Sequence, residues 1–189
     1  METPFSQYME RVRGSRPLVH HITNYVTVND CANICICAGG SPVMTDGEDV
    51  AEMVSISSSS VLNIGTLNSR TVVSMEVAAE TAGSKGVPFL LDPVGAGATG
   101  YRTEVSERLM SMGPAVIKGN AGEIGVLAGT GGDVKGVDSH GATDAAASTE
   151  ALARRTGAIV VASGEVDYIS DGKVTLRLSN GTGMLENVS

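Results

Sequence analysis

The sequence predicts an α/β fold in which a mainly parallel sheet is flanked by helices. Short aliphatic segments alternate with helix-like segments along the 189 residues, which is the pattern of βαβ units. Polar residues or glycines follow several of the aliphatic segments. In residues 87–100, an aliphatic strand reaches Asp92, and a proline and a glycine-rich stretch come next. Ligands of open α/β sheets bind at such strand ends, so this stretch is the first candidate for a functional site.

Turn and cap signals divide the first half of the chain into six elements. Gly39 and Gly40 end a helix that Thr23 or Asn24 can cap. Residues 45–48 have the spacing of a capping box for the next helix. The expected elements are a helix over about residues 5–13, a helix ending at 38, a strand over 41–44, a helix through 53, a strand over 61–65 and a helix over 69–82.

The second half continues this alternation and then changes. Asn120 can cap a helix, and Asp171-Gly172 is the turn of a hairpin that starts near Val166. There is no linker or internal repeat, so we expect one domain over residues 1–189. The expected elements are strands over 87–91, 115–117 and 158–162, helices over 103–110, 121–127 and 142–155, a glycine-rich loop over 129–141, and the hairpin.

Composition narrows the class of partner. A formal net charge of −8 argues against nucleic acid, because phosphate contacts need a basic patch. No apolar run has the length of a membrane span, and the N-terminal residues lack the basic segment of a signal peptide. We therefore expect a cytoplasmic protein that binds neither nucleic acid nor a membrane.

Three cysteines fall close together at Cys31, Cys35 and Cys37. An odd number at this spacing does not indicate a disulfide framework. Cys31 and Cys35 share a helix face and could supply two metal ligands. We favour the simpler interpretation that the cysteines are small buried apolar residues of the helix.

Residues 95–100 spell G-x-G-x-x-G, the pattern of a dinucleotide-binding turn, but their context disfavours that function. In such a site the glycines follow the strand directly, whereas here residues 92–94 intervene and the Asp92 carboxylate would repel a pyrophosphate. The acidic residue that would hold the ribose, about 20 residues further on, is replaced by Lys118-Gly119-Asn120. The sequence also lacks a P-loop.

Polar residues at three consecutive strand ends indicate a different site. Asp92, Glu123 and Ser163 each follow a strand, and parallel strands bring such ends to one edge of a sheet. Asp92 and Glu123 suit Mg²⁺, which takes a few carboxylates plus phosphate oxygens, and Lys118 can balance phosphate charge. The alternative is that Asp92 caps a turn and Glu123 stabilises a helix N-terminus. The spacing alone leaves both open.

The N-terminal part of the chain offers a candidate pocket. Asn24 places an amide at a helix start, Val26 follows it, and Met44 ends a strand. Together they could line a mixed polar and apolar pocket for a small organic molecule. Taken singly, Val26 and Met44 are residues typical of a core.

Taken in order, several segments resemble the hydroxyethylthiazole kinase family of thiamine salvage. The resemblance covers nearly the whole chain, and the block that begins at Asp92 is highly specific. It implies a ribokinase-like α/β fold and transfer of the γ-phosphate of ATP to the hydroxyethyl group of 4-methyl-5-(2-hydroxyethyl)thiazole. The matching segments are residues 17–20, 22–24, 40–44, 62–67, 92–99, 118–121, 123–124 and 164–167.

The resemblance also implies roles for individual residues and a homotrimer with active sites shared between subunits. Many family members carry Arg and Thr where this chain has Lys118 and Ser163, and Lys lacks the bidentate fork of Arg. The implied roles are thiazole contacts for Asn24, Val26 and Met44, ATP contacts for Lys118, Asn120 and Ser163, and a catalytic role with organisation of Mg²⁺ and phosphate for Asp92 and Glu123.

One departure concerns the end of the chain. In the family, a Gly-Thr-Gly-Cys segment follows the equivalent of Val188-Ser189. This segment forms the anion hole, and its cysteine lies at the position of the catalytic base. We therefore expect a truncated chain with impaired turnover. Residues 181–183 are interpreted as the end of the hairpin, and none of the three cysteines aligns with the base. The alternatives are a related kinase of a hydroxymethylpyrimidine-type alcohol and a degenerate, non-catalytic binding protein.

Overall fold

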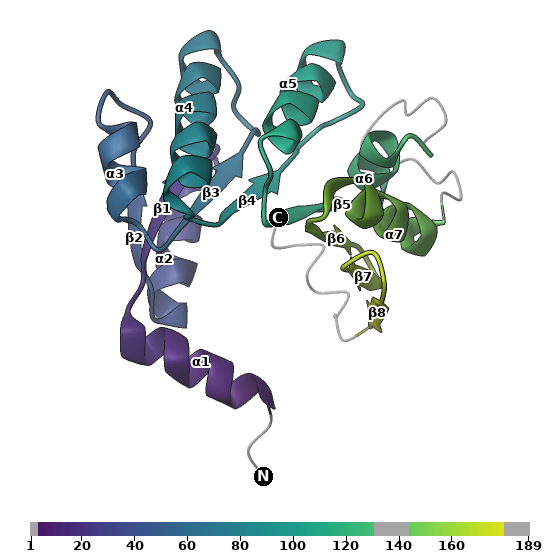
Figure 1. The fold of residues 1–189 in the computed structure, drawn as a ribbon, viewed down its shortest axis with the longest axis horizontal. Coiled ribbons are helices and arrows are strands. Elements are labelled where there is room, and N and C mark those ends of the chain that lie inside the picture. Colours follow the sequence, from purple (N-terminus) through teal and green to yellow (C-terminus); the bar gives the residue numbers. More distant parts are fainter. Residues whose placement is uncertain (1–3, 131–143, 180–189) are drawn as a thin grey trace. The chain divides into compact units, whose positions relative to one another are not determined.

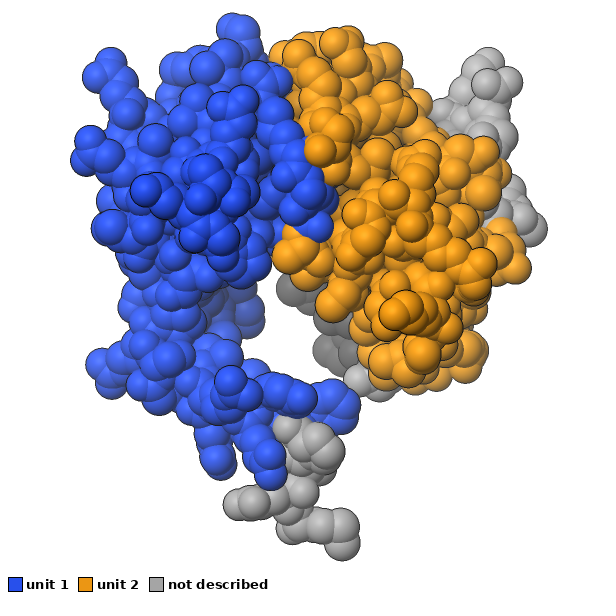
Figure 2. All heavy atoms as spheres, viewed as in Figure 1, with its two compact units in different colours: residues 1–92, 112–114 blue, residues 93–111, 115–189 orange. Residues whose placement is uncertain are grey.

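The computed structural model describes residues 4–130 and 144–179. These residues form two compact units, which Figure 2 shows in different colours. Unit 1 holds residues up to 92 together with 112–114, and unit 2 holds residues 93–111 and those from 115 onward. Most of the expected glycine-rich loop, the first residues of the helix expected from 142, and residues 181–183 lie outside the described residues.

Unit 1 is built on four parallel strands in the order β2-β1-β3-β4 (Figure 1). The crossover from β1 to β2 runs in one direction along the sheet, and the crossovers from β2 to β3 and from β3 to β4 run in the other. Because crossovers of this kind are right-handed, α2 lies on one face of the sheet and α3 and α4 lie on the other. The elements are α1 (Pro4–Ser15), β1 (Leu18–Ile22), α2 (Val28–Ala38), β2 (Ser41–Met44), α3 (Val50–Ile56), β3 (Ser59–Asn63), α4 (Ser69–Lys85) and β4 (Phe89–Asp92).

The start of unit 1 differs from the sequence prediction. Strand β1 occupies a segment where we expected none, and α2 begins only at Val28, with Thr27 at its N-cap. The cap expected at Thr23 or Asn24 is wrong. Asn24 Oδ1 instead accepts the backbone N–H groups of Val26 and Thr27, at 3.1 and 3.0 Å. Its amide thus stabilises the turn before the helix, a common alternative use of a short polar side chain.

The capping box expected over residues 45–48 is also wrong. Helix α3 begins at Val50, and Asp49 is its N-cap. The Thr45 hydroxyl donates to Asp49 Oδ1 at 2.9 Å and accepts the Gly47 N–H. The Thr45 side chain, which looked like a helix cap, therefore stabilises the loop after β2.

Unit 2 contains a parallel strand pair extended by a hairpin. β5 and β6 are parallel, and β7 and β8 add antiparallel strands in the order β5-β6-β7-β8. The hairpin turn at Asp171-Gly172 is confirmed, since Asp171 Oδ1 accepts two backbone N–H groups at 2.8 Å. The elements are α5 (Gly100–Ser111), β5 (Val116–Asn120), α6 (Ala121–Ala128), α7 (Ala145–Thr156), β6 (Ile159–Ser163), β7 (Asp167–Ser170) and β8 (Thr175–Leu178).

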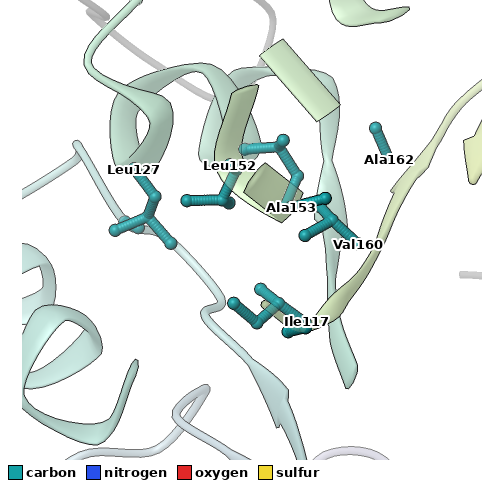
Figure 3. Close-up of a cluster of buried hydrophobic side chains, with 9 residues drawn as sticks. Ile117, Leu127, Leu152, Ala153, Val160 and Ala162 are labelled. Atoms are coloured by element: carbon teal, nitrogen blue, oxygen red, sulfur yellow. The ribbon is translucent and has the colours of Figure 1, made fainter. Parts of the chain in front are cut away.

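A buried aliphatic cluster defines the two faces of the sheet in unit 2 (Figure 3). Ile117, Val160 and Ala162 of the strands pack with Leu127, Leu152 and Ala153 of α6 and α7. Because side chains alternate along a strand, Lys118 and its neighbours two residues away point to the opposite face. The mainly parallel strands flanked by helices confirm the predicted fold class. Within the described part of the chain, no helix is both long and apolar enough to span a membrane.

Gly97, in the glycine-rich stretch after β4, has a φ of +91°, and a Cβ there would lie 2.7 Å from Val126 Cγ2. We predict that Gly97→Ala lowers the free energy of unfolding by about 1–3 kcal/mol, because both the backbone and Val126 must shift. Gly100→Ala is the matched control, since a Cβ at this first residue of α5 meets no described atom within 4 Å. Urea unfolding of both variants measures the difference, and equal stabilities would contradict the prediction.

Candidate functional site

The carboxyl ends of the strands in unit 1 carry the polar residues of the candidate site. β3 ends at Asn63 and β4 ends at Asp92, and these two residues are paired in the parallel register. β2 ends at Met44, which is paired with His21 of β1. Because all four strands are parallel, these ends share one edge of the sheet of unit 1.

A chain of side-chain hydrogen bonds runs along this edge. Asn63 Nδ2 donates to Asp92 Oδ2 at 2.8 Å, and Asn24 Nδ2 donates to Asn63 Oδ1 at 3.2 Å. Asn63 Oδ1 also accepts the Gly65 N–H at 2.9 Å. Two predicted site residues, Asn24 and Asp92, are therefore connected through Asn63.

The chemistry of Asp92 sets the direction of each bond in this chain. A carboxylate only accepts hydrogen bonds, so the NH₂ of Asn63 faces it and the Asn63 carbonyl oxygen faces Asn24 and Gly65. Gly65 permits the close approach, because a Cβ there would lie 2.8 Å from Asn24 Cβ and 2.9 Å from Asn63 Oδ1. Asn63 thus orients both the carboxylate and the turn before α2.

Sequence reasoning did not select Asn63 as a site residue. The signal was present, because Asn63 follows the buried Leu62 at a strand end just as Asp92 follows the buried Leu91. What the sequence did not provide was the parallel register that sets the two side chains opposite each other.

A cavity of about 120 Å³ lies beside the ends of β1 and β2. Met44 lines it, whereas Asn24 does not, and Val26 is 88% exposed. Asp46 at the cavity is held by Arg70 at 2.8 Å, and this contact raises the pKa of Arg70. The lining residues are His21, Ile22, Thr23, Tyr25, Val28, Met44, Thr45 and Asp46.

Glu123 holds two backbone segments of unit 2 together. Its Oε1 accepts the Gly95 N–H and its Oε2 accepts the Asn120 N–H, both at 2.8 Å. Asn120 Oδ1 accepts the Glu123 N–H at 2.9 Å, which completes a capping box and confirms the predicted cap of α6. Stabilisation of a helix N-terminus, one of the two roles considered for Glu123, is therefore observed. Each carboxylate oxygen keeps a second lone pair for a further contact.

Lys118, Asn120 and Ser163 lie on the face of the unit 2 sheet opposite the aliphatic cluster. Asn120 and Ser163 are paired in the register of β5 and β6, and Lys118 stands two residues before Asn120. All three are half-buried, and the Ser163 hydroxyl donates to the Gly119 carbonyl at 3.2 Å. An ammonium, an amide and a hydroxyl on one face form a donor set suited to phosphate or ribose oxygens.

Residues 4–130 and 144–179 contain no group of three or more His, Cys, Asp or Glu that could hold a metal ion. Mg²⁺ needs only one or two protein carboxylates when phosphate oxygens supply other ligands. Asp92 in unit 1 and Glu123 in unit 2 each offer one carboxylate of this kind. The expected meeting of these two side chains stays a prediction.

The cysteines of α2 are less buried than predicted. Cys31 and Cys35 are half-buried and Cys37 is exposed, and all three are free thiols. No residue of α2, all of which is described, is buried, and Ile34 and Ile36 are 69% and 58% exposed. The prediction of buried apolar cysteines is wrong because the described part of the chain leaves this helix largely uncovered. Partial burial raises the pKa of the Cys35 thiol.

A family model described as the hydroxyethylthiazole kinase family matches residues 9–189. The chain belongs to this family. It is 51% identical over 181 residues to a hydroxyethylthiazole kinase of Methanoculleus marisnigri, covering 94% of this chain and 65% of the relative. It is 52% identical over 188 residues to a hydroxyethylthiazole kinase of Methanocorpusculum labreanum, covering 98% of this chain and 71% of the relative. The chain thus spans about two thirds of the length of these relatives.

Solved structures agree with this membership. A hydroxyethylthiazole kinase protein from Pyrococcus horikoshii OT3 matches with a TM-score of 0.87 and 43% identity, covering 96% of this chain and 68% of that one. An adenosine kinase from Schistosoma mansoni matches with a TM-score of 0.56 at 11% identity, which is a likeness of fold alone. The expected ribokinase-like fold is confirmed, and the family is one of phosphotransferases with an alcohol acceptor.

We predict that Asn63→Asp lowers the free energy of unfolding at neutral pH by about 1–3 kcal/mol. The substitution keeps acceptors for Asn24 and Gly65 but sets a second carboxylate against Asp92. The loss should shrink as the pH falls towards about 4, because protonation of one carboxyl restores a donor. Urea unfolding at both pH values measures the effect.

Asn68→Asp is the matched control for this charge change. Asn68 is the N-cap of α4 and accepts the Thr71 N–H at 3.0 Å, a role that Asp performs equally well. Its stability at neutral pH should equal that of the unsubstituted protein. If Asn63→Asp behaves in the same way as this control, the orienting role of Asn63 is wrong.

Proposed function

We propose that the protein transfers the γ-phosphate of ATP to the hydroxyethyl group of 4-methyl-5-(2-hydroxyethyl)thiazole, a reaction of thiamine salvage. Membership of the family supports the reaction class, and relatives half identical over nearly all of this chain carry the substrate in their names. The single structural observation that carries the proposal is the hydrogen-bonded chain from Asn24 through Asn63 to Asp92. These hydrogen bonds fix the position of Asn24, an expected substrate contact, relative to Asp92, the carboxylate expected to act in phosphoryl transfer.

The substrates are bound by two groups of residues in this proposal. Asn24, Val26 and Met44 contact the thiazole beside the cavity at the ends of β1 and β2. Lys118, Asn120 and Ser163 contact the nucleotide from the open face of β5 and β6. Phosphoryl transfer depends mainly on positioning and on charge stabilisation, so the ammonium of Lys118 balances charge on the phosphates.

Asp92 and Glu123 play different parts. Mg²⁺ brought with ATP would neutralise charge on the phosphate oxygens, and Asp92 would hold it with Glu123 as the second carboxylate. Asn63 keeps Asp92 in place for this role. Glu123 also holds the Gly95 and Asn120 N–H groups, so it shapes the backbone on both sides of the expected phosphate position.

The test is an assay of ATP-dependent phosphorylation with Mg²⁺, in which the thiazole alcohol competes with a hydroxymethylpyrimidine. The proposal predicts a phosphorylated thiazole alcohol, detected by mass spectrometry. Asp92→Asn should lower kcat by about 100-fold or more, because the carboxylate that would hold Mg²⁺ beside the transferred phosphate is lost. Glu107→Gln, an equal charge change at an exposed position of α5, should leave kcat unchanged. Preference for the pyrimidine, or full activity of Asp92→Asn, would refute the assignment.

We also propose that the protein is a cytoplasmic homotrimer, as the composition and the family resemblance led us to expect. Apolar residues on α2 and the turn before it support a subunit interface, since Tyr25, Val26, Ile34 and Ile36 are all more than half exposed. An interface there would cover Val26, an expected thiazole contact. Sedimentation equilibrium should give three times the chain mass, and Ile34→Lys should give the mass of one chain. A monomeric unsubstituted protein would contradict the proposal.

A further inference from the structure

His20 and His21 are adjacent in β1, yet their ring nitrogens have different surroundings. His20 Nδ1 lies 2.8 Å from the Ser60 hydroxyl and His20 Nε2 lies 2.9 Å from the Thr45 carbonyl. His21 is only 8% exposed, and neither of its ring nitrogens has a hydrogen-bond partner among the described residues. The two side chains point to opposite faces of the sheet, as alternation along a strand requires.

The state of His20 follows from its partners. A carbonyl oxygen only accepts, so Nε2 of His20 carries the hydrogen and Nδ1 accepts from Ser60. Burial lowers the pKa of His20, which makes the neutral ring the dominant form near pH 7. His20 is therefore fully satisfied by the fold and is not available to a ligand.

His21 is in the opposite situation. Burial, with a smaller contribution from His20, lowers its pKa, so its ring is also neutral near pH 7. A neutral imidazole carries one N–H donor and one lone-pair acceptor. A buried polar group left without a partner costs about 1–3 kcal/mol, and such groups in folded proteins call for an explanation.

The cavity beside β1 and β2 supplies that explanation. His21 lines it together with Met44, its partner in the parallel register, and with Tyr25 from the turn before α2. Its wall is largely apolar with a few polar groups, which is the character of a site for a small organic ring. The imidazole is a buried hydrogen-bonding group in a pocket that already contains an expected substrate contact.

The proposed substrate offers an acceptor for such a donor. The ring nitrogen of a thiazole is an acceptor, while Val26 and Met44 offer no side-chain donor. Asn24 already uses its Oδ1 to accept from the turn before α2 and one of its two amide N–H groups to donate to Asn63. Asn24 and His21 therefore differ, because both ring nitrogens of His21 have no hydrogen-bond partner among the described residues.

We propose that His21 is a specificity-determining residue whose ring N–H donates to the ring nitrogen of the heteroaromatic alcohol bound in this cavity. The proposal rests on the proposed function, and it deepens it by naming the group that distinguishes an azole from a carbocyclic or thiophene ring of the same shape. A site that pairs a buried donor with a substrate acceptor rejects an analogue that lacks the acceptor, because the donor is then left unpaired.

The test compares two ligands on four proteins by isothermal titration calorimetry. The ligands are 4-methyl-5-(2-hydroxyethyl)thiazole and its thiophene analogue, in which a CH replaces the ring nitrogen. The unsubstituted protein should bind the thiazole about 10-fold or more tightly than the thiophene. His21→Leu should reduce this ratio to near one, and His21→Asn, which keeps a donor, should restore a preference. Met44→Leu is the control and should change both affinities by a similar factor.

The outcomes are separable. Equal affinity of the unsubstituted protein for the two ligands would overturn the role of His21, even if the thiazole is phosphorylated. A His21→Leu variant that still prefers the thiazole would also overturn it. The first comparison uses only the unsubstituted protein, so it stands even if His21→Leu fails to fold. No binding and no phosphorylation of the thiazole would refute the proposed function, and this inference with it.

Discussion

The hydrogen bond between the Asn63 amide and the Asp92 carboxylate sets the geometry on which the candidate site of unit 1 depends. It forms because β3 and β4 pair in parallel with Asn63 opposite Asp92, so both side chains leave the same face at the same level. The carboxylate fixes the amide, and the amide fixes Asn24 and the turn before α2. A shift of one residue in the register would turn one side chain to the opposite face and break the hydrogen bond between Asn63 and Asp92.

The two carboxylates of the expected magnesium site contribute in different ways. Asp92 ends a strand and is oriented by the Asn63 side chain. Both carboxylate oxygens of Glu123, in contrast, accept backbone N–H groups, those of Gly95 and Asn120. A carboxylate that closes a loop onto a helix start cannot swing freely, because each displacement leaves a backbone donor unpaired. Glu123 would therefore perform its proposed electrostatic role and its structural role with the same carboxylate. For Asp92 the two roles fall on different residues, because Asn63 does the orienting.

The sequence was sufficient where a local signal decides the structure. The strand ends at Asp92 and Ser163, the cap at Asn120 and the turn at Asp171-Gly172 each rest on a few neighbouring residues. It failed where a polar side chain had several possible partners. Asn24 and Thr45 bond within loops instead of capping helices. Asn63 could not be chosen without knowledge of which strands are neighbours, and the exposure of α2 depends on tertiary coverage rather than on its apolar sequence.

The adjacent histidines show how one strand separates a structural role from a binding role. Their side chains are identical in chemistry and differ by a single step along β1, but a strand repeats every two residues. One ring therefore reaches Ser60 and Thr45, which satisfy both of its nitrogens. The other ring lies beside Met44 in the cavity, where the described residues satisfy neither nitrogen. The described residues give His21 no hydrogen bond, and the proposed substrate contact accounts for a buried imidazole at this position.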